Sequence, residues 1–179
     1  MRIWGRGRPI RESSRPDAEV LTSPNPDPQV LTSSAPHISR ILVVRLREIG
    51  DVVFTTPAVR ALYQHYAGAS IAYVVEPAGA PVVALNTHID QVLVAPRRQG
   101  LSGFRADIGF GRRLRAMKFD LALDFHGGPR ASLLTWLSRA PVRVGYDVAG
   151  RSWMYTIRVA RPRALRPRHS VENQWDLLR

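Results

Sequence analysis

Short apolar runs alternate with amphipathic stretches along the chain from about residue 40 onward. The first run, Ile41–Val44, is continuous and rich in β-branched residues, which is typical of a strand buried on both faces. Further strands are predicted at 70–75, 91–95, 119–125 and 142–146, with a short strand near 155–159. Helices are predicted from the turn at 45–51 to about residue 67, over 77–86, 104–117 and 130–139, and from residue 169 onward.

Strands that alternate with helices indicate an α/β fold. We expect a Rossmann-like, doubly wound parallel sheet with helices on both faces. Sites in such sheets lie at the carboxyl ends of the strands. Two segments are placed at this edge, the turn at 45–51 and the turn at 126–128. We expect the first and fourth strands to be neighbours, so that the two turns face one crevice.

Residues 1–38 differ from the rest of the chain. They are rich in Pro, Ser, Thr and Arg, and the tetrapeptide at 20–23 recurs at 30–33. Such a composition buries too little apolar surface to offset its ordering entropy. We therefore predict a disordered tail at 1–38, a Rossmann-like domain at 39–168, and at 169–179 the start of a helix.

The charge balance is strongly basic, with 26 Lys and Arg residues against 14 Asp and Glu residues, and Lys118 is the single lysine. Arginine binds phosphate and carboxylate in a bidentate manner, so an anionic partner is one interpretation. An Arg-rich, Lys-poor composition that reflects a GC-rich genome is the other, and both are open.

The absence of cysteine excludes disulfides, thiolate metal sites and a Cys nucleophile. No apolar run approaches the length of a membrane span, and no apolar region follows the N-terminal arginines as in a signal peptide. We expect a soluble, cytoplasmic protein, with contact to a membrane surface left open.

The segment Arg45–Pro57 contains the first candidate chemistry. Gly50 leaves room for a ligand beside the chain, and Asp51 at the mouth of the sheet could act as a general base. The alternative is that Asp51 caps a helix. If Thr56 is the cap and Pro57 the first helical residue, Asp51 is free for other work. The turn lacks both the G-x-G-x-x-G fingerprint and a Walker lysine.

The second candidate segment is 124–132. Gly127 and Arg130 lie at a loop and the following helix start, where backbone N–H groups and a guanidinium could hold a phosphate or carboxylate. His126 could hydrogen-bond a sugar or face solvent. No spacing of His, Asp and Glu indicates a metal site, and Ser132 has no neighbouring base. Arg143, near the fifth strand, could reach the crevice or remain solvated.

Taken together, several blocks resemble glycosyltransferase family 9, the ADP-heptose:lipopolysaccharide heptosyltransferases. They are 41–45, 49–53, 55–62, 119–124 with Gly127, 143–146 and 169–172. The resemblance implies a GT-B architecture of two Rossmann-like domains, in which the N-terminal domain receives a phosphorylated lipid A–Kdo or core-sugar acceptor and the C-terminal domain binds the ADP-sugar.

The resemblance also implies roles for individual residues. The family's Gly-Asp motif falls on Gly50 and Asp51, and Asp51 would deprotonate the acceptor hydroxyl for an inverting displacement. With this resemblance, Arg47, Arg60, Arg130 and Arg143 become candidates to hold acceptor phosphates and carboxylates. Together with Gly50, His126 and Gly127 they are the predicted substrate-binding residues.

The donor-binding half has no counterpart in the sequence. We therefore expect an N-terminal fragment or split subunit that is inactive alone, with ADP-heptose bound by the missing domain or a separate chain, and no cofactor or metal. The rival hypothesis is a non-catalytic, Arg-rich module for an anionic ligand, membrane surface or nucleic acid. Its strongest feature is the helix at 104–118, which we interpret as a solvated face; no nucleic-acid motif is present, and nucleic acid is not expected.

Overall fold

The computed structural model describes residues 37–97, 100–160 and 174–178. The predicted tail at 1–38 therefore lies almost wholly outside the described residues, as does the beginning of the helix predicted from residue 169. Within the described part of the chain, no helix is both long and apolar enough to cross a bilayer.

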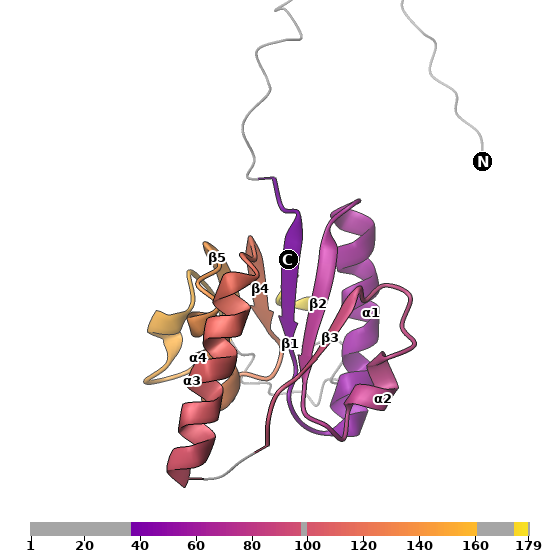
Figure 1. Ribbon diagram of the computed structural model, residues 1–179. Coiled ribbons are helices and arrows are strands. Elements are labelled where there is room, and N and C mark those ends of the chain that lie inside the picture. Colours follow the sequence, from indigo (N-terminus) through magenta and orange to yellow (C-terminus); the bar gives the residue numbers. More distant parts are fainter. Residues whose placement is uncertain (1–36, 98–99, 161–173, 179) are drawn as a thin grey trace, which may run out of the picture. The chain divides into compact units, whose positions relative to one another are not determined.

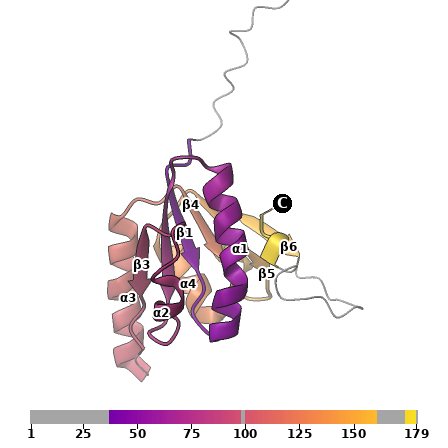
Figure 2. The ribbon, with the colours of Figure 1, turned by 90° about the vertical axis from the view of Figure 1, so that its right-hand side faces the viewer.

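In the described part of the chain, six parallel strands form one sheet in the order β3-β2-β1-β4-β5-β6. Figure 1 labels β1 to β5, and Figure 2 also labels β6. Their bounds are β1 Arg40–Val44, β2 Ser70–Val75, β3 Gln91–Val94, β4 Leu121–Asp124, β5 Val142–Asp147 and β6 Ile157–Ala160. Val43 of β1 pairs with Tyr73 of β2 on one side and with Leu123 of β4 on the other. The prediction that the first and fourth strands are neighbours is confirmed, and so is the Rossmann-like parallel sheet.

Helices cover both faces of the sheet (Figure 2). The helices are α1 Ile49–His65, α2 Ala80–Val83, α3 Gly100–Ala116 and α4 Pro129–Leu137, with a 3₁₀ turn, η2, at Ser152–Met154. Successive side chains of a strand point to opposite faces. Val43 accordingly packs toward α1 and α2, whereas Val44 packs toward α3 and α4, and both are fully buried. The continuous apolar run in β1 is explained by the fact that both faces of this strand pack into the hydrophobic core.

The start of α1 corrects one expectation. The helix begins at Ile49 and Pro57 lies inside it, so Thr56 is not its N-cap. Proline in a helix lacks the N–H that would bind the carbonyl four residues earlier, here that of Val53. The Thr56 hydroxyl donates to this carbonyl at 2.8 Å, and so replaces the missing donor.

Candidate active site

Arg45 and Asp51 form an ion pair at the carboxyl edge of the sheet. Arg45 directly follows β1, and its side chain is 10% exposed. Its guanidinium also donates to the carbonyl oxygen of Phe125, the residue after β4. Arg45 thus joins the ends of two neighbouring strands to the first turn of α1, and the two turns expected to face one crevice do lie together.

Asp51 occupies the first turn of α1, where the helix dipole favours a negative charge. The N-cap is Glu48, with no side-chain capping hydrogen bond, so the capping interpretation of Asp51 is wrong. Its carboxylate is 30% exposed and is held from one side by Arg45. A carboxylate that is oriented by a buried partner and still reaches solvent is suited to taking a proton from a bound hydroxyl.

His126 lies at the same edge, in the loop between β4 and α4, and is half-buried. Burial lowers the pKa of His126, and the positive charges of Arg45 and Arg47 lower it further, against the opposing effects of Asp124 and Asp51. A neutral imidazole can both donate and accept a hydrogen bond. The arrangement places a neutral His beside the Arg45–Asp51 pair.

The loop that carries His126 is shaped by Asp124, which is completely buried. One carboxylate oxygen accepts from the backbone N–H groups of His126 and Gly127, both at 2.8 Å, and Gly127 adopts φ 67°. The other accepts from the Tyr155 hydroxyl at 2.5 Å, and that hydroxyl lies 2.7 Å from the hydroxyl of Ser132. Burial raises the pKa of Asp124, although these hydrogen bonds oppose the shift.

Arg130 is engaged inside the domain. Its guanidinium binds Asp107 at 2.8–3.0 Å, Glu76 at 2.8 Å and the carbonyl of Pro96. The carboxylates of Glu76 and Asp107 are 8% and 12% exposed. A ligand could use Arg130 only by breaking these contacts, so the structure gives it a role in holding α3, α4 and the end of β2 together.

Two other predicted arginines are not brought to the crevice. Arg143 is the second residue of β5, at the opposite edge, and donates to the carbonyls of Met154 at 2.8 Å and Ala140 at 2.6 Å. Arg60 follows Asp51 by nine residues on α1, which places it about 13 Å along the axis and half a turn around the helix.

Arg47 and Gly50 do border open space near the ion pair. The side chain of Arg47 is 63% exposed and lies 3.8 Å from Glu76. A Cβ on Gly50 would meet nothing within 4 Å. A pocket of about 250 Å³ lies beside the first turn of α1; it is lined by Leu46, Arg47, Glu48, Ile49, Val52, Glu76, Ala78, Gly79 and Arg97.

Three residues of this region were not predicted from the sequence: Arg45 as the partner of Asp51, Arg97 in the pocket wall, and Tyr155 as the hydrogen-bond partner of Asp124. A charged residue at the end of a buried strand was the available signal for Arg45. Tyr155 carried none, because its partner lies 31 positions earlier. Among the described residues, no group of three His, Asp or Glu side chains could hold a metal ion.

The chain resembles known proteins in sequence and in structure. Residues 108–179 match the family model described as Glycosyltransferase family 9 (heptosyltransferase). Over 114 residues the chain is 29% identical to lipopolysaccharide heptosyltransferase 1 of Escherichia coli O18:K1:H7 and of Escherichia coli K12. The match to the O18:K1:H7 protein covers 60% of this chain and 35% of that protein.

Solved structures of glycosyltransferases also superpose on this chain. The glycosyl transferase family 9 structure from Veillonella parvula DSM 2008 superposes with a TM-score of 0.71 at 26% identity, over 78% of this chain and 40% of that one. The ADP-heptose LPS heptosyltransferase II of E. coli superposes at 0.64 and 19% identity, over 77% of this chain and 39% of that one, which shows the fold alone. The chain thus spans between a third and a half of the length of these relatives.

Proposed function

Because the chain carries a heptosyltransferase-like domain of glycosyltransferase family 9, we propose that this domain is the acceptor-side half of a glycosyltransferase. The complete enzyme transfers heptose from an ADP-sugar to a lipopolysaccharide core acceptor, with inversion at the anomeric carbon. The single observation that carries the proposal is Asp51, a partly exposed carboxylate at the carboxyl edge of the sheet, oriented by the buried Arg45.

The reaction assigned to this edge is a direct displacement. Asp51 takes the proton of the acceptor hydroxyl, and the oxygen forms a bond to the anomeric carbon as the bond from that carbon to the ADP phosphate breaks. Arg45 fixes the direction of the Asp51 carboxylate. This matters because a small displacement of a catalytic group from the reacting atoms lowers the rate strongly. Arg47 and Arg97 line the pocket beside the first turn of α1, where anionic groups of the acceptor would lie. The neutral His126, close to Arg45 and Asp51, would meet a hydroxyl group of the acceptor.

ADP-heptose is bound by a donor-binding domain that lies outside the described residues, either further along a longer chain or in a separate one. The proposal is supported by the share of the relatives that this chain spans, 35% of the heptosyltransferase from strain O18:K1:H7 and 40% of the Veillonella structure. The 179-residue chain alone is inactive under this proposal, and the complete enzyme works in the cytoplasm at the inner face of the membrane that holds its acceptor.

The decisive experiment replaces Asp51 by Asn in an enzyme reconstituted with a donor-binding domain. Transfer from ADP-heptose to a phosphorylated Kdo–lipid A acceptor should fall by several orders of magnitude, while acceptor binding to the domain is kept. The matched control is Asp147→Asn, which neutralises an exposed carboxylate at the end of β5. Unimpaired transfer by the Asp51 variant, or turnover by the 179-residue chain alone, would contradict the proposal.

A further inference from the structure

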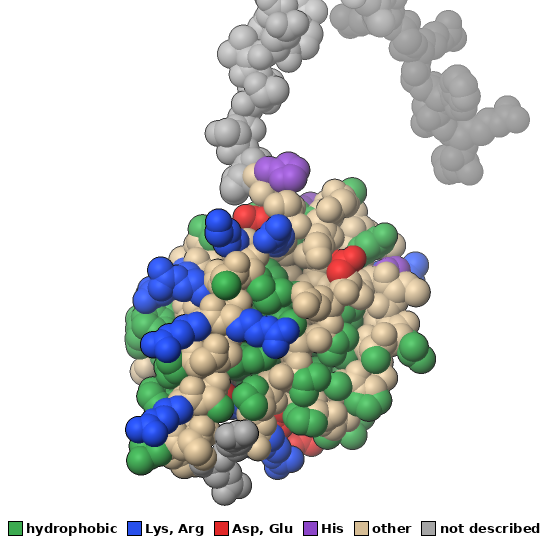
Figure 3. Space-filling model, in the orientation of Figure 1, with side chains coloured by type: hydrophobic (Ala, Val, Ile, Leu, Met, Phe, Trp, Pro, Cys, Tyr) green, Lys and Arg blue, Asp and Glu red, His purple; other side chains and the backbone are tan. Residues whose placement is uncertain are grey.

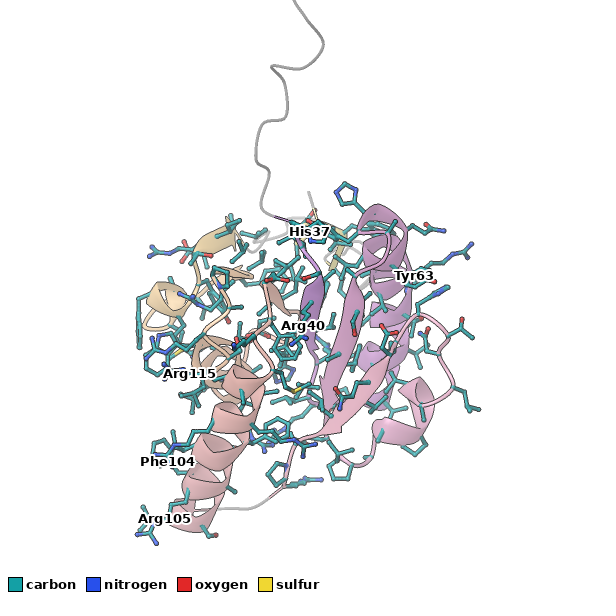
Figure 4. All side chains as sticks on the ribbon, turned by 45° about the horizontal axis from the view of Figure 1, so that its top comes forward. His37, Arg40, Tyr63, Phe104, Arg105 and Arg115 are labelled. Atoms are coloured by element: carbon teal, nitrogen blue, oxygen red, sulfur yellow. The ribbon has the colours of Figure 1, made fainter. Side chains whose placement is uncertain are left out.

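The outward face of α3 combines exposed apolar side chains with arginines. Leu101 is 82% exposed and Phe104 is 56% exposed, both in the first turns of the helix. Arg105, Arg112 and Arg115 follow on the exposed side. Figure 4 shows Phe104 and Arg105 projecting from α3 away from the sheet, and Figure 3 shows Lys and Arg side chains following one another along this side of the molecule.

The spacing places these residues on one stripe. Leu101, Arg105, Arg112 and Arg115 are separated by four, seven and three positions, which are the intervals that return to one face of an α-helix. The opposite face is buried, with Phe110 and Leu114 in the core. The stripe is therefore a continuous surface about 20 Å long, from residue 101 to residue 115.

The stripe carries positive charge without neutralisation. Asp107 is the one acidic residue of α3, and it is turned inward to Arg130. No carboxylate among the described residues pairs with Arg105, Arg112 or Arg115. The sequence alone suggested a solvated helix face, because it could not show that Asp107 is buried while Leu101 and Phe104 are exposed.

We infer that this face of α3 docks on an anionic lipid bilayer. Leu101 and Phe104 enter the boundary between headgroups and acyl chains, and the three arginines lie against lipid phosphates. Charge complementarity favours an anionic surface, and the apolar end of the stripe favours lipid over nucleic acid, whose phosphate backbone offers Leu101 and Phe104 no apolar partner.

The position of the stripe fits the chemistry proposed above. The amino-terminal end of α3, which carries Leu101 and Phe104, lies at the same edge of the sheet as the start of α1 with Asp51 (Figure 1). Docking there would hold the crevice beside the membrane from which a lipid-linked acceptor projects. The biological purpose of the surface rests on the proposed function, but its affinity for lipid does not.

The test is sedimentation of the full chain with vesicles of phosphatidylethanolamine and phosphatidylglycerol, compared with phosphatidylcholine vesicles. Each arginine near an anionic surface contributes about a fivefold factor to binding. Arg105→Gln/Arg112→Gln should therefore lower the partition coefficient by roughly 25-fold. Leu101→Ser/Phe104→Ser should lower it by about tenfold or more, and this loss should persist at high salt.

Matched controls lie elsewhere on the domain. Arg60→Gln/Arg158→Gln removes two exposed charges outside α3, and Leu85→Ser removes a 91% exposed leucine next to α2. Both should bind vesicles within about threefold of the wild type. Circular dichroism and urea midpoints confirm that each variant is folded.

Equal losses in the α3 and control variants would overturn the inference, because binding would then follow net charge alone. Tighter binding to DNA than to anionic vesicles, unaffected by Leu101→Ser/Phe104→Ser, would overturn it in favour of a nucleic-acid surface. The vesicles contain no acceptor and no donor, so this result is independent of transfer. Asp51→Asn should bind vesicles as the wild type does, which separates failure of docking from failure of the proposed function.

Discussion

Replacing Arg130 by Met should destabilise the domain more than any surface change of charge. The guanidinium is 24% exposed and is shared between Asp107 and Glu76, whose carboxylates are 12% and 8% exposed. Without it, the nearest cation to Glu76 among the described ion pairs is Arg47 at 3.8 Å, and Asp107 has none. Breaking a buried ion pair costs about 3–5 kcal/mol. Because Arg130 is partly solvated, we expect a loss of about 2–4 kcal/mol.

Urea unfolding at neutral pH, followed by tryptophan fluorescence, measures this loss. The midpoint should fall while the slope stays constant, since the surface exposed on unfolding is unchanged. Arg113→Met is the matched control, because Arg113 is exposed on the same pair of helices and should change stability by about 0.5 kcal/mol or less. Adding Asp107→Asn and Glu76→Gln to Arg130→Met removes the unpaired charges and should recover part of the stability.

A loss no larger than that of the Arg113 control would refute the reasoning. It would mean that the two carboxylates do not depend on Arg130 in the folded state. Arg130 would then be available to an anionic ligand, as its place at a helix start first suggested. Failure of the triple variant to recover any stability would also count against the charge argument, because it would point to lost packing instead.

Two further predictions concern the buried Asp124 and a pair of glycines. Burial raises the pKa of Asp124, so the folded state keeps a proton that the unfolded chain releases. The contribution of Asp124 to stability is thus greatest below its unfolded pKa and is lost as the pH rises through the raised value. Urea unfolding of Asp124→Asn should show its stability improving relative to the wild type as the pH rises above about 4, the ordinary pKa of an Asp side chain; a constant difference would contradict this. A Cβ on Gly145 would overlap the ring of Tyr155, so Gly145→Ala should lower the free energy of unfolding by about 1–3 kcal/mol. Gly50 lies in open space within a helix, so Gly50→Ala should not lower it and should raise it by up to about 1 kcal/mol. Equal thermal midpoints of the two variants would refute the contrast.

Most of the sheet could be read from local pattern. The run Ile41–Val44 predicts a strand with two buried faces, and it lies in β1, one of the two central strands, with all four residues at 0% exposure. The start of α1 was harder to predict from the sequence. Thr56 and Pro57 have the composition of a helix start, yet hydroxyl groups within the helix can also supply what proline lacks. Side-chain compensation of this kind has no unique sequence signal.

The sequence by itself determined that a strand ends at Val44 and that a Gly-Asp pair follows at the carboxyl edge of a parallel sheet, because periodicity and turn residues act over a few positions. Only the tertiary structure decided which charged side chains form ion pairs with each other. Arg45 became the partner of Asp51, whereas Arg130 was committed to Glu76, 54 positions away. Which charged groups pair depends on which of them are desolvated side by side when distant segments pack. A local sequence pattern contains no information on this.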